Sequence, residues 1–125
     1  MDRMDSLETS EFKAIKRLDL RELAQDTIVT AVTRSTTYCF RVIDAREHLV
    51  EVLEGNTHYF PKRTICRFVG ATKSLHALEI QSGYIVEGLG LEFAEFEGDP
   101  ERAVVTSPVS RFSMLGPPFK ACQNS

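Results

Sequence analysis

Alternation of apolar and polar positions dominates the chain from Thr27 onward and predicts an all-β fold. The clearest pattern is a pair of strands at residues 27–33 and 37–44, joined by a short polar turn at residues 34–36. Both arms are rich in β-branched and aromatic residues, which suit a pleated and half-buried surface. We therefore predict a β-hairpin here, around which the rest of the domain is built.

Further short strands follow the hairpin. They are predicted at residues 47–54, 64–69, 84–87, 89–94 and 103–112. Residues 47–54 carry apolar side chains on both faces, which favours a central position in the sheet. Pro61 excludes an extended piece at residues 57–60 from the interior of a sheet, and Pro108 places the last strand at an edge or beside a bulge. Six to seven antiparallel strands predict a small barrel-like domain, favoured over a sandwich because closure removes exposed edges.

Other segments have weaker patterns. Residues 11–25 predict one short helix or helical turn that ends near Ala24, with Asp19 able to cap its final turn. Residues 70–82 are compatible with a loop, a short helix or a strand. The Gly55-Asn56 pair is typical of a turn with positive φ. We expect a disordered lead-in at 1–10, a single β domain at 11–115 and a polar tail at 116–125.

Composition narrows the class of protein. A length of 125 residues predicts one domain, and a formal charge of -3 argues against a nucleic-acid partner. No stretch approaches the roughly 20 apolar residues of a membrane span, and the polar N-terminus does not resemble a signal peptide. Cys39, Cys66 and Cys122 are widely spaced and odd in number, which fits reduced thiols. We expect a soluble, cytoplasmic protein without a membrane partner.

The sequence contains no recognisable catalytic or metal-binding motif. Zinc-ligating atoms are present in His48, His58, His76, Cys39 and Cys66, but their spacing matches no ligand signature. Serines such as Ser35 lack a nucleophile-elbow context, and no glycine-rich phosphate loop precedes a helix. We therefore predict no cofactor, no metal and no catalytic residue.

The candidate binding residues lie in two short segments. Arg34, Ser35 and Tyr38 place a guanidinium, a hydroxyl and a phenol around the hairpin turn, whereas Tyr59 and Phe60 offer aromatic surface beside two basic residues. Hydroxyl groups commonly close turns and aromatic rings commonly fill cores, so a packing role is the alternative to ligand binding.

The packing alternative makes its own structural prediction. The hydroxyl groups of Thr33 and Ser35 would satisfy backbone groups at the turn. Alternation would place Tyr38 and Phe40 inside the domain, because Arg41 on the opposite face would be costly to bury unpaired.

Several segments together resemble a family of small, uncharacterised bacterial all-β proteins. These segments are Thr33-Arg-Ser-x-x-Tyr38, Gly55-x-x-x-Tyr-Phe-Pro61, Gly88-x-Gly-Leu-Glu-Phe93 and Thr106-Ser-Pro-Val109. The similarity covers residues 20–112, and Asn56 stands where a second glycine is expected after Gly55. The resemblance implies a bacterial cytoplasmic β domain of unknown function.

These observations favour a non-catalytic binding or protein-interaction module, whose partner is an unknown protein or small ligand. One alternative is a small metal-dependent enzyme that uses His58 and the acidic residues near Glu92. Another is a structural subunit that forms a homo-oligomer through an edge strand, at the Pro61 segment or the Pro108 strand.

Overall fold

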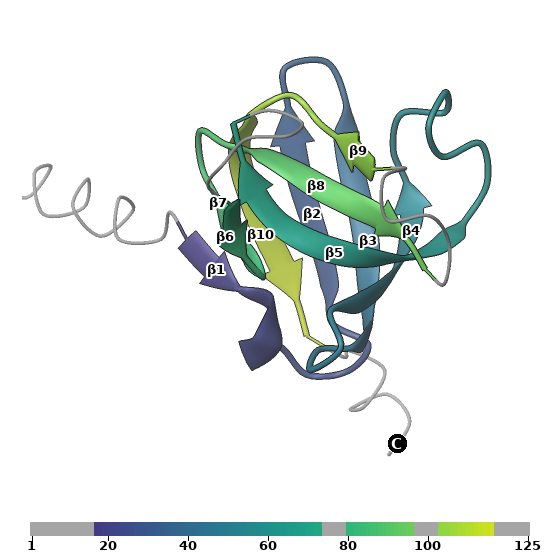
Figure 1. Ribbon diagram of the computed structural model, residues 1–125, viewed down its shortest axis with the longest axis vertical. Helices are drawn as coiled ribbons and strands as arrows, with labels where there is room; N and C mark the ends of the chain where they lie inside the picture. The colour runs from purple at the N-terminus through teal and green to yellow at the C-terminus, as the bar shows by residue number, and fades with distance from the viewer. Residues whose placement is uncertain (1–16, 74–79, 97–102, 117–125) are drawn as a thin grey trace, which may run out of the picture.

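The computed structural model describes residues 17–73, 80–96 and 103–116, and almost all of its regular structure is β (Figure 1). The elements in chain order are β1 (Arg17–Asp19), the 3₁₀ helix η1 (Leu20–Glu22), β2 (Ile28–Thr33), β3 (Thr37–Asp44), β4 (Leu49–Glu54), β5 (Thr64–Thr72), β6 (Ile80–Ser82), β7 (Tyr84–Val86), β8 (Gly90–Glu95), β9 (Ala103–Val105) and β10 (Val109–Leu115). The predicted all-β class is confirmed. The described strands outnumber the six to seven expected because several are only three residues long.

The strands form two antiparallel sheets. The larger sheet has the order β10-β2-β3-β4-β5-β8-β9, with β6 also paired to β5, and the smaller sheet pairs β1 with β7. Figure 1 shows β5 and β8 crossing in front of β2, β3 and β10, so the larger sheet curls over itself. As predicted, β4 is a central strand, between β3 and β5.

Backbone hydrogen bonds also join one end of the curled sheet to the segment that precedes β8. β9 and β10 are its terminal strands. The backbone N–H of Gly88 donates to the carbonyl of Val109 (2.8 Å), and the N–H of Val109 donates to the carbonyl of Leu89 (3.0 Å). These bonds tie the start of β10 to the segment that precedes β8. The described strands do not form a continuous ladder between β9 and β10, so the shape is barrel-like without a closed set of strand pairs.

The predicted hairpin is confirmed as β2 and β3. The Thr33 hydroxyl donates to the carbonyl of Thr36 (2.9 Å) and accepts from its N–H (3.2 Å), so it closes the turn as expected. The same expectation is wrong for Ser35, whose exposed hydroxyl makes no hydrogen bond within the described part of the chain. Alternation along β3 buries Tyr38 and Phe40, as the packing alternative predicted.

Aromatic side chains fill the centre of the curled sheet. The ring of Phe40 is stacked on Phe68 with centroids 5.9 Å apart, and it meets Phe93 edge-on at 5.7 Å. All three are at most 1% exposed. Burial of each such ring stabilises the fold by roughly 2–3 kcal/mol, so this cluster is the main apolar support of the domain.

The predicted last strand at residues 103–112 is wrong as a single strand. β9 ends at Val105, and β10 begins after Pro108 on the opposite end of the sheet. Between them, the N–H of Thr106 donates to the carbonyl of Leu91 (2.9 Å), and the Thr106 hydroxyl accepts from the Leu91 N–H (3.0 Å). Proline, which has no N–H to donate, stands where the chain crosses from one strand to the next. The expected edge position is confirmed for β10.

The N-terminal part also departs from expectation. Arg17–Asp19 is a strand rather than part of a helix, and the helical turn is limited to Leu20–Glu22. Asp19 caps this turn as predicted, because its carboxylate accepts from the N–H of Arg21 at 3.0 Å. The turn places the Leu20 side chain entirely within the core.

Some expectations fall wholly or partly outside the described residues. Within the stretch 70–82, β5 continues to Thr72 and β6 begins at Ile80, whereas residues 74–79 lie outside the description. The lead-in at 1–10 lies outside it as well, as does the predicted tail beyond Gly116.

Candidate ligand cleft

The loop between β4 and β5 begins with a capped helical turn. The side-chain carbonyl of Asn56 accepts from the N–H of His58 (2.8 Å), and its backbone carbonyl accepts from the N–H groups of Tyr59 (3.0 Å) and Phe60 (2.8 Å). The expected extended conformation at residues 57–60 is therefore wrong. Asparagine is a favoured residue at such a capping position, because its side chain satisfies an otherwise unpaired backbone N–H.

Gly55 is required by close packing rather than by its backbone angles. Although a Gly-Asn pair accepts positive φ, neither Gly55 nor Asn56 adopts it. A Cβ atom at Gly55 would lie 2.7 Å from Cδ2 of Tyr38. The absence of a side chain thus lets the β4–β5 loop pass directly over the buried ring of Tyr38.

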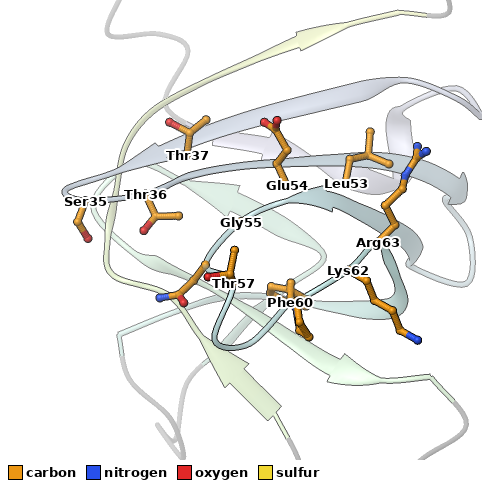
Figure 2. Close-up of a pocket in the computed structure, with 12 residues that line it drawn as sticks. Ser35, Thr36, Thr37, Leu53, Glu54, Gly55, Thr57, Phe60, Lys62 and Arg63 are labelled. Carbon is orange, nitrogen blue, oxygen red and sulfur yellow. The ribbon is translucent and has the colours of Figure 1, made fainter.

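This loop and the tip of the β2–β3 hairpin enclose an open cleft of about 750 Å³, which we term the hairpin cleft. Figure 2 shows its lining, with the hairpin tip facing the loop that carries the basic residues. The lining residues are Ser35, Thr36, Thr37, Leu53, Glu54, Gly55, Asn56, Thr57, Phe60, Pro61, Lys62 and Arg63. Segments about twenty positions apart in the sequence thus form one surface.

Several polar groups of the hairpin cleft are available to a ligand. The hydroxyl groups of Ser35 and Thr57 and the ammonium group of Lys62 make no hydrogen bond or ion pair within the described residues. The carboxylate of Glu54 is likewise without such a partner there. The cleft therefore offers both donors and acceptors that the fold itself does not use.

Arg63 is the end of a chain of ion pairs. Its Nε atom lies 3.6 Å from Oε2 of Glu51, whose other oxygen is 3.0 Å from Arg41. Arg41 also contacts Asp26 at 2.6 Å. Hydrogen bonds to Glu51 and Asp26 raise the pKa of the Arg41 guanidinium above its usual value. This network orients Arg63 along the outer face of the sheet, while its side chain remains 65% exposed.

Tyr38 and Phe60 lie beneath the loop. Their rings meet edge-on with centroids 6.4 Å apart, and Phe60 meets Phe93 in the same way at 5.6 Å. Burial raises the pKa of the Tyr38 phenol, the nearby Tyr59 adds to this effect, and a hydrogen bond with the backbone of Asn56 opposes it. Tyr38 therefore supports the loop from below, and Phe60 forms part of the cleft wall.

The five candidate binding residues separate into three groups. Ser35 and Phe60 line the hairpin cleft. Arg34 is exposed on the hairpin turn and Tyr59 is 48% exposed, but neither lines that cleft. Tyr38 is only 3% exposed and serves packing. The structure thus brings the two sequence segments together, although it does not place all five side chains on one surface.

A second cleft of about 410 Å³, which we term the aromatic cleft, shares Phe60 with the hairpin cleft. Tyr59, Ile65, Phe93 and Val104 are among its lining residues, and so is the thiol-bearing Cys66. Burial raises the pKa of the Cys66 thiol to about 12. Because this thiol stays protonated at neutral pH, it is suited to packing and not to nucleophilic attack.

The geometry gives no support to the metal-dependent alternative. Among residues 17–73, 80–96 and 103–116, no group of three or more His, Cys, Asp or Glu side chains is placed to hold a metal ion. The ring of His58 instead meets that of Tyr59 edge-on, 5.2 Å between centroids. His76 and Cys122 lie outside the described residues.

Sequence reasoning missed part of the cleft. The sequence pattern predicts Asn56 as a turn residue, Thr57 as part of an extended segment and Glu54 as the end of a strand. The capping preference of asparagine was the signal that could have identified the helical turn at Asn56. Lys62 and Arg63 follow the aromatic pair in the sequence, but their place in the same cleft as Ser35 depends on strand pairing across β3 and β4.

No protein-family model, curated protein or solved structure matches this chain. No helix in the described part of the chain has the length and apolar character needed to cross a membrane.

Proposed function

We propose that this chain is a non-catalytic binding module and that the hairpin cleft receives its ligand. The observation that carries this proposal is the convergence of the hairpin tip and the capped β4–β5 loop on one cleft. Ser35, Thr57 and Lys62 line this cleft, and their polar groups make no hydrogen bond or ion pair within the described residues. Surface polar groups without a packing role are the usual contacts of a binding site.

The ligand that fits these groups is an acidic, extended segment of a partner protein. Lys62 gives the cleft a positive charge that has no ion-pair partner within the described residues, and Arg63, which also pairs with Glu51, adds a second basic group against the carboxylate of Glu54. Hydroxyl and amide groups at Ser35, Asn56 and Thr57 can pair with both the N–H and the C=O groups of a peptide. The open hairpin cleft suits an extended peptide better than a small molecule, which needs a more enclosed pocket. The resemblance noted above supports a bacterial cytoplasmic setting for this partner.

Fluorescence anisotropy with a labelled peptide of alternating Asp and Glu tests the proposal. We expect saturable binding to the full chain, and no binding of a matched peptide of alternating Lys and Arg. Lys62→Glu should weaken binding by at least about tenfold, which corresponds to roughly 1.4 kcal/mol. Arg46→Glu makes the same charge change at the β3–β4 turn, away from the cleft, and should leave the affinity unchanged.

Two results would overturn the proposal. The first is an absence of binding to the acidic peptide at low ionic strength, where charge attraction is strongest. The second is an equal loss of affinity in the Lys62→Glu and Arg46→Glu proteins, because this would mean that only net charge matters.

A further inference from the structure

Among the described strands, the terminal strand β10 is paired along one edge only, and its other edge is bonded only at Val109. It pairs with β2 on one side and ends the larger sheet on the other. Met114 and Leu115 on this strand are 54% and 59% exposed, the highest values among the exposed large apolar side chains of the described residues. An exposed apolar strand edge is an established site for pairing with another strand.

The register identifies which backbone groups point outward. The N–H of Thr33 bonds to Thr36 and the carbonyl of Thr27 to Val42, so the odd-numbered residues of β2 direct their backbone groups toward β3. Antiparallel pairs alternate between bonded and non-bonded positions. The even-numbered residues of β2 therefore bond to β10, where their partners are Arg111, Ser113 and Leu115.

It follows that the N–H and C=O groups of Phe112 and Met114 point away from β2. Val109 has the same orientation, and its outward N–H and C=O groups are those bonded to Leu89 and Gly88. No hydrogen bond to the outward groups of Phe112 and Met114 occurs within the described residues.

We propose that β10 pairs with β10 of a second copy of this chain, antiparallel and centred on Ser113. In this register Phe112 of one copy faces Met114 of the other, twice by symmetry, so all the outward groups of both residues are bonded. The same pairing brings a thioether against an aromatic ring, which is a favourable contact. A two-fold axis through a strand edge is the usual way in which identical chains pair.

Charge also favours this register. Arg111 is opposite Leu115 of the other copy, so the two Arg111 side chains are separated by four residues along the strand. At about 3.3 Å per residue this separation is roughly 13 Å, more than the Debye length at physiological salt. A register centred on Arg111 would instead place the two guanidinium groups directly opposite each other, which is unfavourable.

The proposal is independent of the hairpin cleft and makes a register-specific prediction for cross-linking. In a Cys39→Ser, Cys122→Ser background, Ser113→Cys should form a disulfide-linked dimer on mild oxidation, because opposite residues at non-bonded positions lie closest. Arg111→Cys and Leu115→Cys should each remain monomeric when oxidised alone. An equimolar mixture of these two proteins should give the linked heterodimer.

Sedimentation velocity on the chain without engineered cysteines is a second test of dimer formation. A strand edge buries less area than a standard interface, so the mean mass should rise toward that of a dimer only between about 10 µM and about 1 mM. Met114→Lys should shift this rise to at least tenfold higher concentration. Ile65→Lys, at a position of similar exposure (49%) on β5, should not shift it.

A monomer throughout the concentration range would overturn the proposal, and so would an equal effect of the two lysine variants. Cross-linking of Arg111→Cys or Leu115→Cys alone, without cross-linking of Ser113→Cys, would show that the register is wrong.

Discussion

Tyr38 is the residue on which the packing and binding interpretations of the hairpin turn differ most. Its ring is 3% exposed and packs against Gly55 and Phe60, whereas Arg34 is exposed on the turn. Tyr38→Ala should lower the free energy of unfolding by about 3 kcal/mol, as truncation of a core aromatic does. Arg34→Ala should cost less than about 0.5 kcal/mol. Urea unfolding of the two variants measures both values, and a fully stable Tyr38→Ala protein would contradict the observed packing.

Gly55 provides a second test of the same contact. Gly55→Ala should destabilise the fold by about 1–3 kcal/mol, because its methyl group would displace the Tyr38 ring or the loop. In the Tyr38→Ala background the same change should cost much less, since the ring is gone. A double-mutant cycle by urea unfolding measures this coupling. Additive effects would show that the close approach has no energetic consequence.

The thiol of Cys66 should make the stability depend on alkaline pH. Its pKa is about 12 in the folded state and about 8.5 in an unfolded chain, so above pH 8.5 the unfolded state loses a proton that the folded state keeps. The contribution of this thiol to the free energy of unfolding is therefore fully present below pH 8.5. It falls as the pH rises, by at most about 1.4 kcal/mol per pH unit. The raised pKa of Tyr38 acts in the same direction above about pH 10.

Urea unfolding at pH 8 and pH 10.5 measures this loss. Between these two pH values the free energy of unfolding of Cys66→Ala should fall by about 2.5 kcal/mol less than that of the unmodified chain. An identical decline in the two proteins would mean that burial of the thiol does not perturb its ionisation.

At the scale of elements, the capped turn that begins the β4–β5 loop is the most informative. Asn56→Ala should cost about 1 kcal/mol, because the N–H of His58 loses its partner, whereas Asn56→Asp should retain most of the stability. Thermal or urea unfolding of the two variants gives the comparison. Equal stability of Asn56→Ala and the unmodified chain would indicate that the cap does not hold the turn.

The elements differ in how far the sequence predicts them. Alternation on both sides of a turn of three polar residues was sufficient for β2 and β3, because period-two burial identifies a half-buried strand. Local pattern was not sufficient at residues 103–112, where strand-forming residues on both sides of Pro108 predict one strand although the chain crosses between the two ends of the sheet. Such a crossing depends on long-range pairing with β8 and β2, which local pattern does not encode.

The same limit applies to the candidate site. The composition of the turn near Ser35 and of the loop near Phe60 singled out both segments, because polar turn residues and an aromatic-proline pair are local signals. Their joint enclosure of the hairpin cleft follows from the pairing of β3 with β4, together with the small size of Gly55. Of the other candidates, Arg34 lies outside the lining of the cleft and Tyr38 is buried beneath the loop, positions that local composition does not distinguish.

At the scale of the whole molecule, the two proposed contact surfaces have different locations. The hairpin cleft is formed at the end where β2 meets β3 and β4 leads into β5, whereas the free groups of Phe112 and Met114 lie on the terminal strand β10. Self-pairing through β10 therefore uses none of the residues that line the cleft. A dimer would carry one cleft on each copy, so an acidic segment repeated within a partner could bind both and gain avidity.

The most direct test of the binding account is a ¹H–¹⁵N NMR titration of the full chain with the peptide of alternating Asp and Glu. We predict that the amide resonances of Ser35, Asn56 and Lys62 shift together and fit one dissociation constant, while those of the β3–β4 turn at Arg46 stay in place. Absence of shifts around the hairpin cleft, or shifts centred on Arg46, would contradict the account.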